Sequence, residues 1–155
     1  MKIEKIVKPE QKITSLTTMT PVEKLPELIG PGFMKLAEYI RQEGAEIISA
    51  PFVSYKGIKE DGQIEGGTVE MEIGFPLDRI IAETAEIRSY VLPSYKAMST
   101  LFKGRYDDLT NPYMEMLALI KKENGTFTGI SYEYYLSDEE IASDQHETLL
   151  EVTYR

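Results

Sequence analysis

The chain has 155 residues, of which 42% are hydrophobic, and its formal net charge is −9. This length suffices for one globular domain with its own core, and no apolar run reaches the roughly 18 residues that a membrane span requires. The absence of cysteine excludes disulfides and thiolate chemistry. The acidic balance argues against direct nucleic-acid binding, which needs a basic face. A cytoplasmic location is the default expectation.

The first half of the chain is predicted to form a strand, a helix and two further strands. Apolar alternation indicates strands near 12–19, 50–56 and 68–76. An apolar stripe at helical spacing predicts a helix near 33–43. The sequence TPVE is typical of a capping box with proline at the first helical position, so we expect a short extra helix over 21–29.

The second half repeats this order. Apolar periodicity predicts strands near 95–103, 129–137 and 147–154, and a helix near 106–122. The halves also align, because FMKLAEYIRQEG matches YMEMLALIKKENG and EMEIGF matches LLEVTY. We therefore expect one α+β domain over residues 1–155. Duplicated β-α-β-β units, about 1–80 and 81–155, would form two lobes about a pseudo-twofold axis with a central aromatic and acidic cleft.

The stretch ISYEYYLSD, which begins at Ile130, places a glutamate between tyrosines in a predicted strand. Successive strand side chains point to opposite faces. Tyr132 and Tyr134 are then predicted to face the core under the helices, and Glu133 and Tyr135 to face away from them. The same alternation in the other strands predicts a groove on the side without helices, unless a β-bulge reverses the phase. Its predicted lining is Glu70, Glu72, Glu133, Glu151, Tyr55 and Tyr135.

An ordered set of segments resembles the GyrI-like small-molecule-binding domains of the SOUL/GyrI superfamily. The set comprises LPSYKAMSTLFKGRYDDL at 92–109, GISYEYYLSD at 129–138 and the terminal ETLLEVTYR, with APFVSYKG and EMEIGFPL in the first half. The resemblance covers nearly the whole chain and implies a duplicated fold with a hydrophobic, aromatic cleft. In the family's multidrug-sensing transcription regulators, a buried glutamate faces lipophilic cations. By motif position that residue is Glu133, and the acidic residue of the last strand is Glu151. Because no helix-turn-helix pattern precedes the domain, we do not expect a self-contained regulator.

The first functional hypothesis is the binding of lipophilic, cationic or electrophilic small molecules, with Glu133 as the charge partner. Burial raises the pKa of a carboxyl group, tyrosine hydrogen bonds lower it, and a bound cation compensates the buried charge. Aromatic walls bind flat cations through cation–π contact and shape. The alternative is that Glu133 is an ordinary solvated strand residue. The predicted binding residues are Glu133, Tyr135, Tyr55, Glu151, Glu72, Tyr90, Val53 and Met98.

A second hypothesis is catalytic, because the resemblance includes hydrolases that open the cyclopropane rings of DNA-alkylating natural products, a detoxification reaction. Glu133 would be the general base, Tyr135 a donor to the developing oxyanion, and Glu151 a second carboxylate. A third hypothesis is a protein-interaction module resembling gyrase inhibitors. The scattered negative charges do not favour it.

No metal and no cofactor are predicted. A zinc site would need His146, the only histidine, together with three carboxylates, which is an unusual set. His146 is therefore predicted to lie on the surface. Ser99 and Ser131 have no histidine base at a suitable spacing, so a hydrolase triad has no support. The expected partner is a small ligand, without a membrane or nucleic acid, and both a monomer and a homodimer remain open.

Overall fold

A computed structural model describes residues 1–137 and 142–155 of the chain. Within these residues, strands and helices follow the predicted order in each half. Short 3₁₀ turns at Val22–Lys24 and Tyr106–Asp108 precede the two helices. The elements are β1 (Glu4–Lys8), β2 (Gln11–Pro21), α1 (Leu25–Gln42), β3 (Phe52–Lys56), β4 (Thr68–Pro76), β5 (Ile87–Leu92), β6 (Tyr95–Lys103), α2 (Thr110–Lys122), β7 (Phe127–Tyr135) and β8 (Glu147–Tyr154).

The strands form one antiparallel sheet whose order reflects the predicted duplication. The order is β1-β6-β8-β7-β3-β4-β2-β5. Exchanging each strand of the first repeat with its counterpart in the second gives the same order read from the other edge of the sheet, as a pseudo-twofold axis between β7 and β3 requires. The duplicated α+β fold is therefore confirmed. The strands β1 and β5 are additions that the sequence pattern does not predict.

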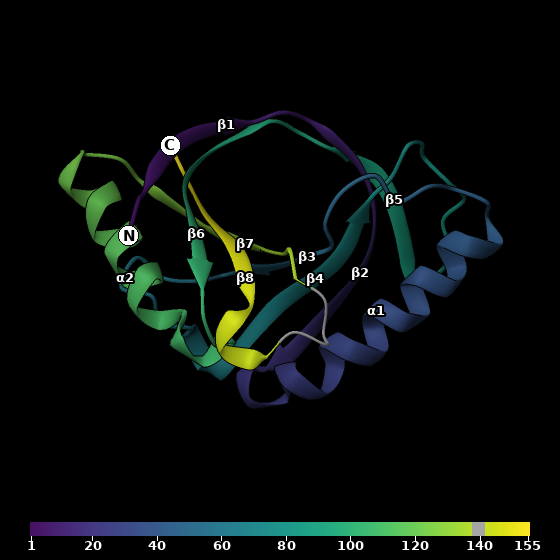
Figure 1. The fold of residues 1–155 in the computed structure, drawn as a ribbon, viewed down its shortest axis with the longest axis horizontal. Helices are drawn as coiled ribbons and strands as arrows, with labels where there is room; N and C mark the ends of the chain where they lie inside the picture. The colour runs from purple at the N-terminus through teal and green to yellow at the C-terminus, as the bar shows by residue number, and fades with distance from the viewer. Residues whose placement is uncertain (138–141) are drawn as a thin grey trace.

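Two short connections force the sheet to curl. Only Pro9 and Glu10 separate β1 from β2, and only Pro93 and Ser94 separate β5 from β6. The three Cα–Cα steps from β1 to β2 span at most about 11 Å, whereas six flat strand spacings would measure roughly 29 Å. The two flanks of the sheet must therefore approach one another. Figure 1 shows β1 and β6 arching over the middle of the molecule toward β2 and β5.

Both helices cover the same face of the curled sheet, which we call the helical face. Val53, Glu133 and Leu150 lie side by side across β3, β7 and β8, so their side chains share this face. Val53 packs in the cluster beneath α1, and Leu150 in the cluster beneath α2. The other side of the sheet, which carries Glu72 and Glu151, is called the opposite face.

The helix α1 is longer than predicted, because it continues through Pro31 where the sequence suggests a break between two helices. Leu25 and Phe33, on either side of Pro31, both pack onto the same sheet cluster, which holds the helix in line. A Cβ atom on Gly32 would overlap Cδ1 of Ile73, so glycine allows the helix to lie this close to the sheet. The predicted capping box is wrong, since Thr20 donates to the Pro21 carbonyl instead.

The opposite face has a core of its own. Ile13, Phe52, Tyr132 and Tyr134 are all buried there, so both faces of the central strands are covered by side chains. The predicted facing holds for β4 and β8, but it is reversed for β3 and β7. The physical reason is that Tyr132 and Tyr134 fill this second core, and alternation cannot distinguish it from the core beneath the helices.

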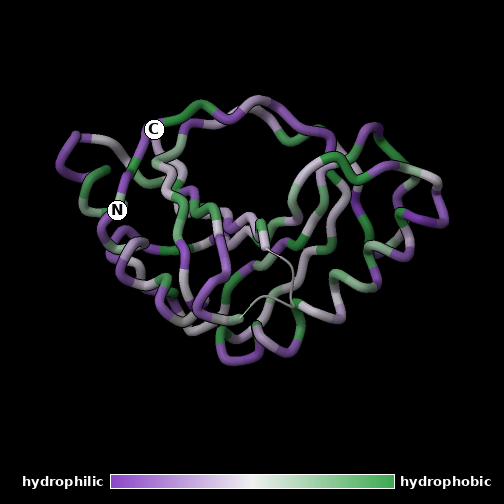
Figure 2. Tube along the Cα trace, in the orientation of Figure 1, coloured by the Kyte–Doolittle hydropathy of each residue, from purple (hydrophilic) through white to green (hydrophobic). Residues whose placement is uncertain are grey.

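Figure 2 shows hydrophilic and hydrophobic residues alternating along both helices, as expected for helices with one side on a sheet and one in solvent. Neither helix in residues 1–137 and 142–155 combines the length and the apolar character needed to cross a bilayer.

Candidate functional site

The structure divides the predicted binding residues between the two faces, so the single groove predicted above is wrong. The division follows from the register, because residues paired across neighbouring strands share a face. The helical face carries Glu133, Tyr135, Tyr55, Val53 and Met98. The opposite face carries Glu70, Glu72, Glu151 and Tyr90.

On the helical face, Glu133 lies near the C-terminal end of β7 and is only partly accessible to solvent. The Tyr135 hydroxyl donates a hydrogen bond to Oε1 of Glu133 at 2.8 Å. Burial raises the pKa of Glu133 from 4.5 to about 7, and the hydrogen bond from Tyr135 opposes this rise. The carboxyl group therefore changes charge near neutral pH.

Further tyrosine hydroxyls surround the Glu133–Tyr135 pair. The hydroxyls of Tyr55 and Tyr135 interact with each other, and the charge of Glu133 acts on both groups. Tyr113, from α2, has a buried hydroxyl that also experiences the charge of Glu133. Burial is the main cause that raises the pKa of all three phenols, so they remain protonated donors at neutral pH.

Aromatic rings from both halves of the chain extend this cluster. Phe33 of α1 contacts the Tyr135 ring edge-on at 6.4 Å between ring centres, and Tyr106 contacts it at 5.3 Å. His146 stacks on Tyr106 at 5.0 Å and is 9% exposed. The predicted surface position of His146 is therefore wrong, because the aromatic neighbours that bury it are distant in sequence.

The Glu133 carboxylate has no charged partner in the described part of the chain. No lysine, arginine or histidine among those residues forms an ion pair with it, and the only hydrogen bond found for it there comes from Tyr135. A buried carboxylate without a cation is costly when ionised. This arrangement can therefore either receive a cation or accept a proton near neutral pH.

The glutamates of the opposite face have cationic partners. Glu151 pairs with Lys8 at 2.9 Å. Glu72 accepts hydrogen bonds from Ser15 at 2.6 Å and Tyr90 at 2.5 Å, and Lys56 lies 3.5 Å away. The sequence reasoning missed both lysines. Lys8 belongs to a strand that was not predicted, and Lys56 became recognisable only once the facing of β3 was known.

Other parts of the described structure are weaker candidates for a functional site. A hollow of about 460 Å³ lies beside α1, lined in part by Lys35, Glu38 and Glu86. Lys35 and Glu86 pair with each other there, so the hollow presents a neutralised surface. Among the residues that the structure describes, no group of three potential metal ligands comes together. We therefore place the candidate site at Glu133.

The model of one known family matches the chain over nearly its full length. The family is described as the GyrI-like small molecule binding domain, and residues 1–154 match it. No curated protein matches the chain.

Several solved structures share the fold. In an EcmrR–DNA complex, EcmrR superposes with a TM-score of 0.82 and 17% identity, over 99% of this chain and 57% of that one. The chain thus spans little more than half of EcmrR, and the isolated EcmrR C-terminal domain matches with a TM-score of 0.78 and 18% identity, over 99% and 97%. A hydrolase encoded by lin2189 from Listeria innocua has a TM-score of 0.66 and 12% identity, over 99% and 92%. SAV2435 bound to tetraphenylphosphonium has a TM-score of 0.60 and 11% identity, over 100% and 94%. At these identities the likeness concerns the fold.

Proposed function

Because this chain belongs to the GyrI-like small-molecule-binding family, we propose that it binds lipophilic organic cations at Glu133 on the helical face. The observation that carries the proposal is a largely buried carboxyl group with tyrosine neighbours and no cationic partner among the described residues. The fold that it shares with SAV2435, which has been seen with tetraphenylphosphonium, supports the choice of ligand class.

Charge compensation supplies the driving force. Below pH 7 Glu133 is mainly neutral, and above it the carboxylate is ionised with no counter-ion among residues 1–137 and 142–155. A lipophilic cation neutralises this charge and loses little hydration on leaving water. Binding of the cation then lowers the pKa of Glu133. Cation binding is therefore accompanied by proton release when the pH is below about 7, and the affinity increases as the pH rises through this value.

The aromatic neighbours supply contact area. Phe33, Tyr55, Tyr106 and Tyr135 come from four different segments around Glu133. Each ring face that meets a cation contributes roughly 0.5–2 kcal/mol. Aromatic walls bind by area and shape, which suits a range of flat or bulky cations more than one specific hydrogen-bonding pattern.

Titration with tetraphenylphosphonium, followed by calorimetry and tyrosine fluorescence, tests the proposal. We expect saturable binding by the wild type at pH 8 and a large loss of affinity in Glu133→Gln. Glu70→Gln is the matched control, because it removes a glutamate from the opposite face. Equal affinity in wild type and Glu133→Gln would contradict the proposal.

A second candidate function is hydrolysis of an electrophilic ligand at the same carboxyl group. It is favoured by the Glu133 pKa of about 7 and by the Tyr135 donor at 2.8 Å. In a cyclopropane conjugated to a carbonyl, Glu133 would take a proton from water while the water oxygen bonds to a ring carbon. The electron pair of the broken ring bond would move to the carbonyl oxygen, where Tyr135 stabilises the enolate. The enolate then takes up the proton, which completes the addition of water.

Mass spectrometry distinguishes the two candidate functions. Incubation with a cyclopropane-bearing alkylator should yield the water adduct with the wild type and not with Glu133→Gln if the protein is a hydrolase. Saturable binding of tetraphenylphosphonium without any water adduct would leave a binding protein.

A further inference from the structure

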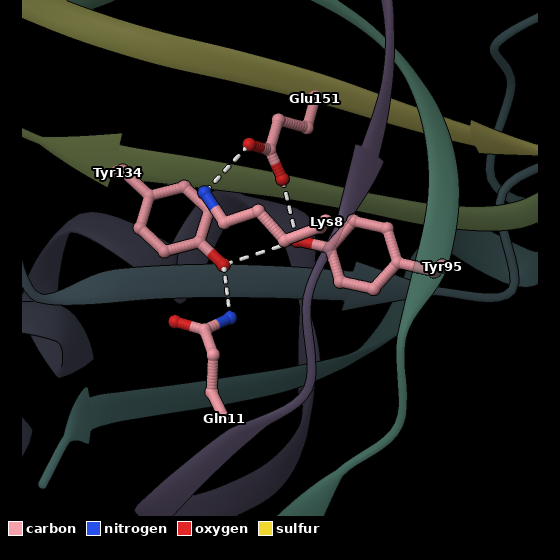
Figure 3. A network of polar contacts seen from close by, with 5 residues as sticks. All are labelled: Lys8, Gln11, Tyr95, Tyr134 and Glu151. Carbon is pink, nitrogen blue, oxygen red and sulfur yellow. Dashed lines mark hydrogen bonds and ion pairs between the residues drawn. The ribbon is translucent and has the colours of Figure 1, made fainter.

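On the opposite face, away from Glu133, Glu151 forms a largely buried ion pair with Lys8. The Lys8 ammonium group donates to Oε2 of Glu151 at 2.9 Å and lies 4.1 Å from the centre of the Tyr134 ring. The other carboxylate oxygen accepts a hydrogen bond from Tyr95 at 2.5 Å. Figure 3 shows the ammonium group between the carboxylate and the face of the ring. These two contacts are the ones that a bound organic ammonium ion makes.

The side chains around the Lys8 ammonium group are hydrogen-bonded to one another independently of Lys8. Tyr95 donates its single hydroxyl proton to Glu151, so at its 3.0 Å contact with Tyr134 it must be the acceptor. Gln11 in turn donates to the Tyr134 hydroxyl at 3.3 Å. Hydrogen bonds therefore run from Gln11 through both tyrosines to the carboxylate (Figure 3), and none of them involves Lys8.

Lys8 reaches this site from the surface. It is the last residue of β1, next to the connection that crosses to β2. Its side chain is 20% exposed, whereas that of Glu151 is fully buried. The carboxylate and the tyrosines are thus fixed parts of the sheet, and the lysine is a flexible stem that enters between them.

We propose that Glu151, Tyr95 and Tyr134 form a second cation site, for slim primary ammonium groups, which Lys8 occupies as a tethered ligand. A buried carboxylate requires a cation, so withdrawal of Lys8 favours entry of another one. A free amine binds in competition with Lys8, whose tether gives it a high effective concentration. The site involves neither Glu133 nor the helical face, so it is independent of the function proposed above.

The contacts define the class of ligand. The bond to Glu151 needs an N–H donor, which a quaternary ammonium or phosphonium ion lacks. The Lys8 side chain enters as an unbranched methylene chain, so the approach to the site fits linear alkylamines and linear diamines. Bulky lipophilic cations belong to the Glu133 site instead.

Replacing Lys8 with alanine tests this site directly, because the substitution removes three methylene groups and the ammonium group, which together correspond to n-propylammonium. We expect Lys8→Ala to melt at a lower temperature than the wild type, and n-propylammonium chloride to raise its Tm in a saturable manner. Its affinity for this amine should exceed that of the wild type at least about tenfold, since Lys8 no longer competes. Sodium chloride and tetramethylammonium chloride at equal concentrations should not have this effect.

Lys56→Ala is the matched control on the same face. Lys56 lies 3.5 Å from Glu72 and 3.4 Å from Glu70, so its removal also takes an ammonium group from a buried glutamate. Glu72 keeps its bonds from Ser15 and Tyr90, and we expect no specific response to n-propylammonium.

The double variant Lys8→Ala/Glu151→Gln should also lose the response, because it has no carboxylate to compensate. The proposal is contradicted if Lys8→Ala responds to n-propylammonium no more than to sodium chloride, or if the double variant responds equally. If Lys8→Ala alone is unfolded, n-propylammonium must restore its circular dichroism spectrum, and failure to restore it contradicts the proposal as well.

Discussion

Glu133 and Glu151 lie on adjacent strands of one sheet, but their side chains point to opposite faces and have different partners. Glu151 is fully buried and pairs with Lys8 from the same chain. Glu133 has a tyrosine donor and no cation among the described residues. Burial of a carboxylate alone therefore does not indicate a ligand site. The informative difference is whether the chain supplies the compensating charge.

The largest effect is expected at the paired glutamate. Lys8→Ala removes the counter-ion of the fully buried Glu151 side chain, which should lower the free energy of unfolding by roughly 3 kcal/mol. Urea denaturation at pH 7.5 measures this loss, and Glu151→Gln in the same chain should restore most of it. A Lys8→Ala protein as stable as the wild type would remove the contrast between the two glutamates.

At Glu133, a substitution is expected to raise the free energy of unfolding, whereas Lys8→Ala lowers it. The folded-state pKa of Glu133 is raised from 4.5 to about 7, so ionisation of this group lowers the stability of the folded state as the pH rises from about 4.5 to above 7. Glu133→Gln removes this penalty and should be more stable than the wild type at pH 8.5, by up to roughly 3 kcal/mol.

The difference in stability between wild type and Glu133→Gln should change with pH in the same window. Urea denaturation at a series of pH values should show a gain that is large at pH 8.5 and small at pH 5. A gain that does not depend on pH would contradict the raised pKa and would place Glu133 closer to Glu151 in behaviour.

A smaller effect is expected from the hydrogen bond at the helical face. Tyr135→Phe removes the only donor found for Glu133 among the described residues, and such a bond to a charged group contributes roughly 1.5–3 kcal/mol in favour of the carboxylate. The pKa of Glu133 should therefore rise above its wild-type value. The pH midpoint of tetraphenylphosphonium binding reports this shift, and an unchanged or lower midpoint would show that Tyr135 does not stabilise the carboxylate.

The smallest effect is expected at Lys56. The Lys56 side chain is 32% exposed. Its ammonium group is shared between Glu70 at 3.4 Å and Glu72 at 3.5 Å. Lys56→Ala should cost no more than about 1 kcal/mol, as for most exposed ion pairs. Urea denaturation beside Lys8→Ala tests the ranking, and an equal loss in both variants would show that the aromatic contact of Lys8 adds nothing.

The sequence predicts the duplicated α+β fold because each repeat carries its own periodic apolar pattern and the two patterns align. The YEYY segment, through its family likeness, also leads to the prediction that Glu133 is the site residue, which the experiments above are designed to test. The facing of Glu133 could not be predicted, because Tyr132 and Tyr134 form a second core on the opposite face and look like the residues beneath the helices. Alternation gives two faces without saying which one a helix covers.

The charged partners of the glutamates could not be predicted from the sequence, for a different reason. Lys8 approaches Glu151 only because the sheet curls, and the curl follows from two connections whose strands lie far apart in the sheet order. His146 is buried by Tyr106, which lies just before α2 of the same half-repeat but 40 residues earlier in the sequence. Such long-range contacts leave no local pattern in the chain.

The most direct measurement is an NMR pH titration of the Glu133 carboxyl carbon, without and with saturating tetraphenylphosphonium. We predict a pKa near 7 in the free protein, because the carboxylate is buried and the part of the chain that the structure describes places no cation beside it. We also predict that the ligand lowers it clearly, because the bound cation stabilises the charged form. A pKa near 4.5 in the free protein, or one that the ligand leaves unchanged, would contradict the role of Glu133 as the unpaired charge of the site.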